Sequence, residues 1–344
     1  MTQALNSSSP ARIVTKVRPR GLRPVTIVSL VVMAAISAMS LFVDGYTLSS
    51  YRDVLLLALF ALSLDIFWGR TGILSFGHAT FFGLGAYGMA VTTIRFGIDP
   101  AWASLAGLAV GVGGAAVVAA IVGFFILYGG VRGAYFTIVT LALTIIANQI
   151  AVGWSEVTGG DSGLIGVPPF AAFGLSFDDP VYGFYLAFGF LAIFLFLSLW
   201  ILGGRTGLVL AAIRDDEIKA RTLGYRTQFI LLATFVISAA IAGLAGAVYA
   251  TGSGFVAPDL IAILLSTEVI VWVAVGGSGT LIGPVIGTIV VWQLQDRISS
   301  INYAAWPVAI GLFFILLVLV FPDGLPAYVV RLAQKLRGAM GRQS

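Results

Sequence analysis

The sequence predicts an all-α integral membrane protein, a bundle of about ten transmembrane helices. The first reason is composition: 59% of the residues are hydrophobic and only 10% are charged, whereas a soluble domain carries about 25% charged residues. The second is that the apolar runs are continuous and near the length of roughly 20 residues that a helix needs to cross about 30 Å of hydrocarbon. A transmembrane barrel would instead show alternating segments of about ten residues.

Ten apolar runs follow one another along the chain. They lie near residues 25–43, 53–68, 73–94, 101–127, 134–153, 181–202, 229–251, 264–276, 280–296 and 305–321. The first run is longer than the apolar core of a signal peptide, so we interpret it as a retained anchor, with a cleaved signal as the minor alternative. The eighth and ninth runs are short and interrupted by glycine, and a re-entrant pair stays open there.

The distribution of lysine and arginine predicts the orientation. Ten spans place both termini on one side, and 16 of the 19 basic residues then lie on that side. Only Arg52, Arg95 and Arg297 fall on the other. Because basic residues favour the cytoplasmic side, both termini are expected in the cytoplasm. The expected parts are a basic cytoplasmic tail (1–24), a transmembrane domain (25–326) with an outer loop (154–180) and a cytoplasmic loop (203–228), and a second basic cytoplasmic tail (327–344).

Several chemistries are excluded by residues that the sequence lacks. There is no cysteine, and His78 is the single histidine, so disulfides, thiolate metal sites and histidine clusters are excluded and no metal is expected. None of the three lysines follows a glycine, so the chain has no Walker A motif and no ATP site of its own. The net charge of +4 follows the two sides of the membrane and indicates no nucleic-acid partner. We expect a conduit without a cofactor rather than a catalyst.

The cytoplasmic loop is the most charged stretch after the N-terminal tail. A helix is predicted over residues 208–222, with two acid–base pairs four residues apart: Asp215 with Lys219, and Glu217 with Arg221. Both pairs have the acid on the N-terminal side, which is the more stabilising order.

This predicted helix is either a solvated loop or a docking surface for a cytoplasmic partner. The three acids at 215–217 stand side by side, so they cannot all pair within the helix. At least one of them is expected to be available to a partner, which favours docking.

A few polar side chains fall inside the apolar runs. A polar residue at membrane depth is a functional candidate, so we consider His78, Ser75 and Glu268 as lining residues of a translocation pathway. The alternatives are a hydrogen-bonded packing role for His78 and a buried interhelical hydrogen bond for Glu268. Asp65 lies near the end of its run, and we expect it to snorkel toward water.

Glycines predict where the membrane helices break. Gly77 interrupts the third run, and Gly276, Gly277 and Gly279 separate the eighth from the ninth. Glycine at this density allows the backbone to turn or to approach a neighbour closely. Irregular backbone at membrane depth persists only where it is buried in protein or lines a cavity.

The order of short motifs resembles a known family. The motifs are Gly72–Tyr87 with Gly77-His78, Arg132–Leu141, Thr158–Gly163, Ala212–Glu217 with Gly224, Ser238–Gly246, Gly276–Pro284 and Pro322–Leu325. At these positions the chain resembles the permease subunits of bacterial ATP-binding cassette (ABC) importers for branched-chain amino acids, the LivM type. The resemblance runs from about residue 51 to 326 and keeps the motif order.

This resemblance implies a type II importer permease in the bacterial cytoplasmic (inner) membrane. It implies as partners a second homologous permease chain, two cytoplasmic ATPase subunits that bind the ATP, and an extracytoplasmic substrate-binding protein. It also places the residues that couple to the ATPase on the cytoplasmic loop: Arg214, Asp215, Asp216, Glu217 and Lys219.

Three alternatives to this function stay open. Permeases for urea or short-chain amides are closely similar, above all over residues 272–283. An ion-coupled secondary transporter would use intramembrane carboxylates, for which Asp65 and Glu268 are the support. A membrane enzyme would need clustered polar residues at one interface, and the sequence shows none.

Overall fold

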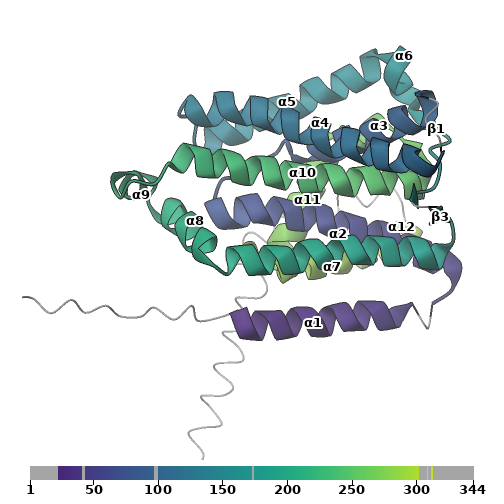
Figure 1. The fold of residues 1–344 in the computed structure, drawn as a ribbon, viewed down its shortest axis with the longest axis horizontal. Coiled ribbons are helices and arrows are strands. Elements are labelled where there is room, and N and C mark those ends of the chain that lie inside the picture. The colour runs from purple at the N-terminus through teal and green to yellow at the C-terminus, as the bar shows by residue number, and fades with distance from the viewer. Residues whose placement is uncertain are drawn as a thin grey trace, which may run out of the picture.

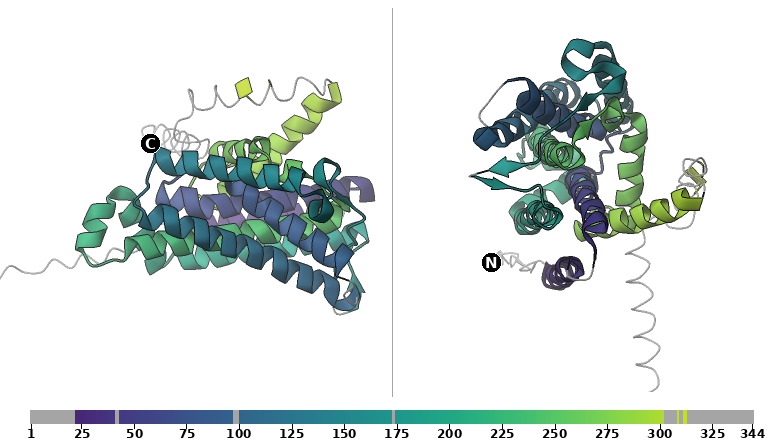
Figure 2. Two further views of the ribbon diagram at one scale, coloured as in Figure 1. Left: turned by 90° about the horizontal axis from the view of Figure 1, so that it is seen from above. Right: turned by 90° about the vertical axis from the view of Figure 1, so that its right-hand side faces the viewer.

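The computed structural model describes residues 22–40, 43–96, 100–172 and 174–301 and positions 308, 311 and 312. Long helices dominate and lie nearly side by side (Figure 1). They are α1 (Leu22–Met39), α2 (Gly45–Thr71), α3 (His78–Arg95), α4 (Pro100–Tyr128), α5 (Ala134–Gly153), α7 (Pro180–Leu202), α10 (Thr227–Ser253), α11 (Ile263–Gly276) and α12 (Ile282–Ile301). Figure 2 shows α1 at the edge of the bundle, apart from the other helices.

These helices account for the first nine apolar runs. Five of them, α2, α4, α5, α7 and α10, are long and apolar enough to cross a membrane. A helical membrane protein is therefore confirmed, whereas the count of ten spans is not. Nearly all of the tenth run (305–321) and the two tails lie outside the described residues, apart from the start of α1 and positions 308, 311 and 312.

The centre of the bundle is formed by α2, α3, α4 and α10, and glycine lets these helices meet closely. A Cβ atom at Gly85 of α3 would lie 2.6 Å from the Cα of Gly243 on α10. A Cβ atom at Gly88 would lie 2.6 Å from the Cα of Gly111 on α4. Helices in lipid gain little from burying apolar surface, so close backbone packing between small residues holds them together.

The short elements gather at the two ends of the bundle. One end carries α8 (Arg205–Asp215) and α9 (Glu217–Thr222), and we call it the linker end (Figure 1). The opposite end carries α6 (Ser155–Thr158), η1 (Gly160–Ser162), η2 (Pro258–Ile261) and four strands, β1 (Leu164–Ile165), β2 (Ala171–Ala172), β3 (Leu175–Ser176) and β4 (Phe255–Val256). Strand β1 pairs antiparallel with β4, and β2 with β3. These strands are two residues long and leave the bundle itself helical.

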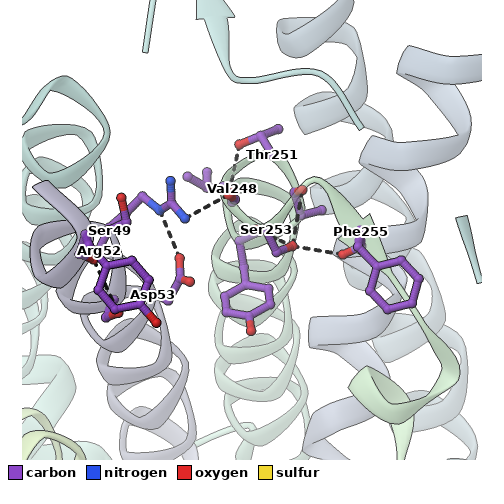
Figure 3. Close-up of polar contacts among 12 residues, drawn as sticks. Ser49, Arg52, Asp53, Val248, Thr251, Ser253 and Phe255 are labelled. Atoms are coloured by element: carbon purple, nitrogen blue, oxygen red, sulfur yellow. Dashed lines mark hydrogen bonds and ion pairs between the residues drawn. The ribbon is translucent and has the colours of Figure 1, made fainter. Parts of the chain in front are cut away.

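Polar side chains join α2 to α10 at the end opposite the linker. The guanidinium of Arg52 donates to the Asp53 carboxylate at 2.9 Å and to the carbonyl of Gly252 at 2.8 Å. Figure 3 shows Arg52 and Asp53 on one helix, with Thr251, Ser253 and Phe255 on the facing chain segment. The hydrogen bond from Arg52 to Gly252 links the two central helices at this end.

Helices α11 and α12 form a hairpin whose turn lies at the linker end, against the end of α2. From there α12 runs back along α2, and Gln293 Nε2 donates to the Tyr51 hydroxyl at 3.1 Å near the start of α2. Helix α12 therefore extends along most of α2. Helix α11 has only 14 residues. The irregular segment 254–262, which contains β4 and η2, connects α10 to the start of α11.

Candidate functional site

The charged linker folds as two helices, and the prediction of one helix over 208–222 is wrong. The break falls at Asp216, whose side chain accepts the backbone N–H of Lys219 at 3.0 Å and so caps the start of α9. Aspartate is a preferred residue at this position because it satisfies an N–H group that the helix leaves unpaired. That hydrogen bond is also the main reason why the pKa of Asp216 lies below its ordinary value. Lys219 consequently pairs with Asp216, at 3.1 Å, and not with Asp215.

Glu217 ties the linker to the turn between α4 and α5. Its carboxylate accepts two hydrogen bonds from Arg132, at 2.8 and 3.0 Å. It also accepts from Thr227 at 3.0 Å and from Arg221, the predicted partner, at 3.2 Å. The hydrogen bonds from Arg132 are the main reason why the pKa of Glu217 lies below its ordinary value. Glu217 is thus engaged within the chain, and the exposed Asp215 is better placed to meet a partner.

Arg214, in the last turn of α8, reaches the end of α2. Its guanidinium donates to the carbonyl of Gly69 at 2.8 Å. A Cβ atom at Gly72 would lie 3.3 Å from its Cγ atom. The Arg214 side chain therefore packs against the bundle, although the residue as a whole remains exposed.

Asp65 does not snorkel toward water, and that expectation is wrong. The residue is completely buried. Its Oδ1 accepts the backbone N–H of Gly279 at 2.5 Å, and its Oδ2 accepts that of Leu281 at 3.0 Å. A buried carboxylate needs such donors, because leaving it unpaired is costly. The turn between α11 and α12 supplies them.

Three glycines that the sequence marks as helix breaks shape this turn. Gly277 and Gly279 have φ angles of +89° and +84°, a region that side chains disfavour. At Gly276 the constraint is space, because a Cβ atom would collide with the backbone of Gly283 on α12. The first two allow the turn, and the third allows the two helices to cross closely.

The fourth predicted break lies between α2 and α3. Residues 72–77 are not helical, and α5 satisfies part of their backbone. Thr140 Oγ1 accepts the N–H of Phe76 at 3.2 Å, and Thr144 donates to the Phe76 carbonyl at 3.2 Å. A Cβ atom at Gly77 would lie 2.6 Å from the Thr140 carbonyl oxygen. The break is thus buried against protein, as irregular backbone in a membrane must be.

His78 begins α3 and lies in the core. Its Nε2 shares a 2.8 Å hydrogen bond with the Ser63 hydroxyl, and its ring stacks on Phe60 at a centroid distance of 5.4 Å. Both partners belong to α2, and these contacts are those of a packing residue. Ser75, also buried, accepts the N–H of Gly77 at 3.3 Å within the break.

The start of α3 also meets α11. The backbone N–H of Ala79 donates to the Ser266 hydroxyl at 3.3 Å. Glu268 lies two residues further along α11 and is half-buried. Helix α11 is therefore joined to the start of α3 beside the pathway candidates His78 and Ser75. Sequence analysis did not identify Ser63 or Ser266, and it did not predict the partners of Arg132 and Asp65.

Comparison with known proteins extends these observations. The chain is 28% identical to the high-affinity branched-chain amino acid transport system permease protein LivM of Escherichia coli (strain K12), over 92% of this chain and 78% of that protein. It is also 28% identical to the LivM protein of Salmonella typhimurium, over 82% of this chain and 71% of that protein. The autoinducer 2 import system permease protein LsrC of Yersinia pseudotuberculosis serotype O:1b is 32% identical, but over only 34% of this chain and 36% of that protein. No solved structure matches.

The profile of one family covers most of the chain. It matches residues 46–322, from the start of α2 to beyond α12. The matched range therefore includes the charged linker, Asp65 with its two donors, and the non-helical segments 72–77 and 277–281. The chain belongs to the family of permease components of branched-chain amino acid transport systems.

Proposed function

We propose that this chain forms the translocation pathway for branched-chain amino acids in an ABC importer. The observation that carries the proposal is the alignment with two LivM proteins over 92% and 82% of the chain. The partners in this proposal are a second homologous permease chain, two cytoplasmic ATPase subunits and an extracytoplasmic binding protein. The binding protein provides capture and specificity, so the permease itself needs few polar contacts with its substrate.

In this proposal the linker end faces the cytoplasm and α8 and α9 dock the ATPase. Two internal ties support a docking role: Glu217 with Arg132, and Arg214 with the end of α2. A surface held in this way can pass a force to the bundle, whereas a loosely attached loop cannot. The bundle would have ten spans, with residues 305–321 as the last, between the cytoplasmic tails 1–24 and 327–344.

The alternatives have less support. An ion-coupled transporter needs a carboxylate that binds and releases its ion, whereas Asp65 is occupied by two backbone N–H groups. Import of urea or short-chain amides rests on residues 272–283 alone, and the long alignments with LivM proteins favour amino acids.

The first prediction concerns transport. With its ATPases, second permease and binding protein in liposomes, the chain should take up radiolabelled leucine only when ATP is supplied. Uptake should persist when the proton gradient is collapsed. Labelled urea with the same proteins is the control for the substrate. Uptake of leucine by this chain alone, or of urea in place of leucine, would contradict the proposal.

The second prediction concerns orientation. The chain has no cysteine, so a single Ser162→Cys substitution gives an unambiguous label in the exposed segment after α6. A membrane-impermeant maleimide should label it in intact cells stripped of their outer membrane. A cysteine at the exposed Ile218 of α9 should react only after the cytoplasmic membrane is permeabilised. The reverse pattern would place the linker outside and exclude it as an ATPase docking surface.

A further inference from the structure

Three segments that are far apart in the sequence meet at the linker end of α2. They are the last turns of α2, the last turn of α8, and the turn between α11 and α12. The residues that join them are Asp65, Gly69, Arg214, Gly279 and Leu281, and we call this set the α2 junction.

Asp65 holds the turn between α11 and α12 in a shape that the turn does not favour by itself. Besides its two positive-φ glycines, the turn contains Leu281 at a φ of +64°, the only non-glycine residue with positive φ among the described residues. Such a conformation is uncommon for a branched side chain and requires support from its surroundings. The N–H group of Leu281 is one of the two that Asp65 accepts. The carboxylate therefore fixes the turn at its most strained residue.

The backbones of α2 and the turn are also in direct contact. A Cβ atom at Gly69 would lie 2.7 Å from the Cα of Gly279, and one at Gly279 would lie 2.9 Å from the Gly69 carbonyl oxygen. At Gly69 and Gly279 the backbones of α2 and the turn lie directly against each other, so a shift of one segment toward the other must displace that other segment. Close-packed contacts of this kind transmit displacement rather than absorb it.

Arg214 attaches the linker to the same point. The Gly69 carbonyl that receives its hydrogen bond is the one that touches Gly279. Its NH1 atom would lie 3.8 Å from a Cβ atom at Gly279. One peptide unit of α2 thus contacts both the linker and the hairpin turn.

From the junction, α11 leads to the start of α3, next to the non-helical segment 72–77. It extends from the turn at Gly277 to Ser266, whose hydroxyl accepts the N–H of Ala79. The chain of contacts runs from Arg214 through Gly69, Gly279 and α11 to the residue beside His78. Each step is a hydrogen bond, a backbone contact or a single helix.

We propose that the α2 junction couples movement of the linker to the α11–α12 hairpin, with Asp65 and Arg214 as positioning residues. The proposal rests on the proposed function, because it is the docked ATPase that would move the linker. When ATP binding by the docked ATPase moves the linker, the hairpin turn moves with the linker, and α11 shifts relative to the start of α3. A displacement of packed helices of this kind is a recognised way in which a local change spreads through a protein.

The test uses the complete transporter with Asp65→Asn or Arg214→Ala in this chain. Asparagine keeps the size of Asp65 but replaces one of its two accepting oxygens with an NH2 group, so one of the two N–H donors then faces another donor. Both variants should recover the ATPases and hydrolyse ATP, but the leucine transported per ATP should fall at least about fivefold, within the usual range of coupling between sites. The matched control is Asp44→Asn at the exposed start of the same helix, where asparagine caps the helix as well as aspartate does, and it should leave this ratio unchanged. The double variant should fall no further than the more severe single one, because both act on one connection.

A second measurement follows the turn itself. Ser278 is exposed in the turn, and a Ser278→Cys variant of this cysteine-free chain can be labelled with maleimide with and without ATP. The labelling rate should depend on ATP, and Arg214→Ala should remove that dependence. An unchanged transport ratio in both variants, or an ATP response that survives Arg214→Ala, would overturn the inference. If Asp65→Asn does not fold, the two Arg214→Ala measurements decide. Failure of the unaltered chain to recover any ATPase would instead contradict the proposed function.

Discussion

Substitution of Gly85 by alanine is expected to prevent the bundle from forming a stable fold. The added methyl group would collide with the backbone of Gly243, with its carbonyl group closest and its Cα at 2.6 Å. Both partners are helix backbone in the centre of the bundle, so no side-chain rotation relieves the collision. The cost should lie at or above the upper end of the roughly 1–3 kcal/mol that overpacking a core causes. The measurement is the midpoint of thermal unfolding of the purified chain in detergent.

Gly113→Ala is the matched control for this substitution. Gly113 lies in α4, and apart from its chain neighbours and the backbone of its own helix no heavy atom lies within 4 Å of the position of its added Cβ atom. Alanine is the better helix former by about 0.8–1 kcal/mol, so this variant should unfold at the same or a higher temperature. If Gly85→Ala unfolds at the same temperature as the unaltered chain, the close approach of α3 and α10 does not hold in the membrane.

Reversal of the charge at Glu217 is expected to abolish ATP-driven uptake while the chain still enters the membrane. Glu217→Arg would place a second guanidinium group against Arg132, where the Glu217 carboxylate now accepts two hydrogen bonds from it. Hydrogen bonds to a charged group contribute about 1.5–3 kcal/mol each. Losing them should release the linker from the turn between α4 and α5. Leucine uptake and recovery of the ATPase with the permease are the two measurements.

A double variant in which Glu217 and Arg132 exchange their charges distinguishes an internal contact of Glu217 from a contact with the ATPase. If Glu217 acts by binding Arg132, then Arg132→Glu combined with Glu217→Arg should restore part of the uptake. The restoration is incomplete because Arg132 also donates to the carbonyls of Leu127 and Val131. A single Glu217→Arg variant with normal uptake and normal ATPase recovery would show that the tie is not needed. No restoration in the exchanged pair would indicate that Glu217 binds the partner directly.

The sequence predicted the helices well because long apolar runs and the positions of charged residues are local signals. The run 134–153 coincides with α5, and 181–202 differs from α7 by one residue. The start of α3 was missed by five residues. Its break depends on hydrogen bonds to Thr140 and Thr144, which lie 64 to 68 positions later in the sequence. No local pattern reveals such a partner.

The charged residues were harder to place for the same reason. Asp65 looked unpaired because its donors are backbone N–H groups more than 200 residues away. Glu217 was correctly paired with Arg221, but Arg132 lies in another loop. The break at Asp216 did have a local signal. The run Asp-Asp-Glu is typical of a helix N-terminus, whereas the acid–base spacing over the same residues favours one continuous helix.

The bond between Asp65 and the hairpin turn also bears on how the chain is made. The two partners are separated by 214 positions, so α2 leaves the ribosome long before its donors exist. Helix α11, with 14 residues, is about 21 Å long and too short to cross about 30 Å of hydrocarbon alone. It can be integrated only together with α12, against a bundle that is already in place. The hairpin must therefore be inserted late, after α2 to α10, and any chain that stops before residue 279 keeps a carboxylate inside the membrane without the donors that the finished protein provides.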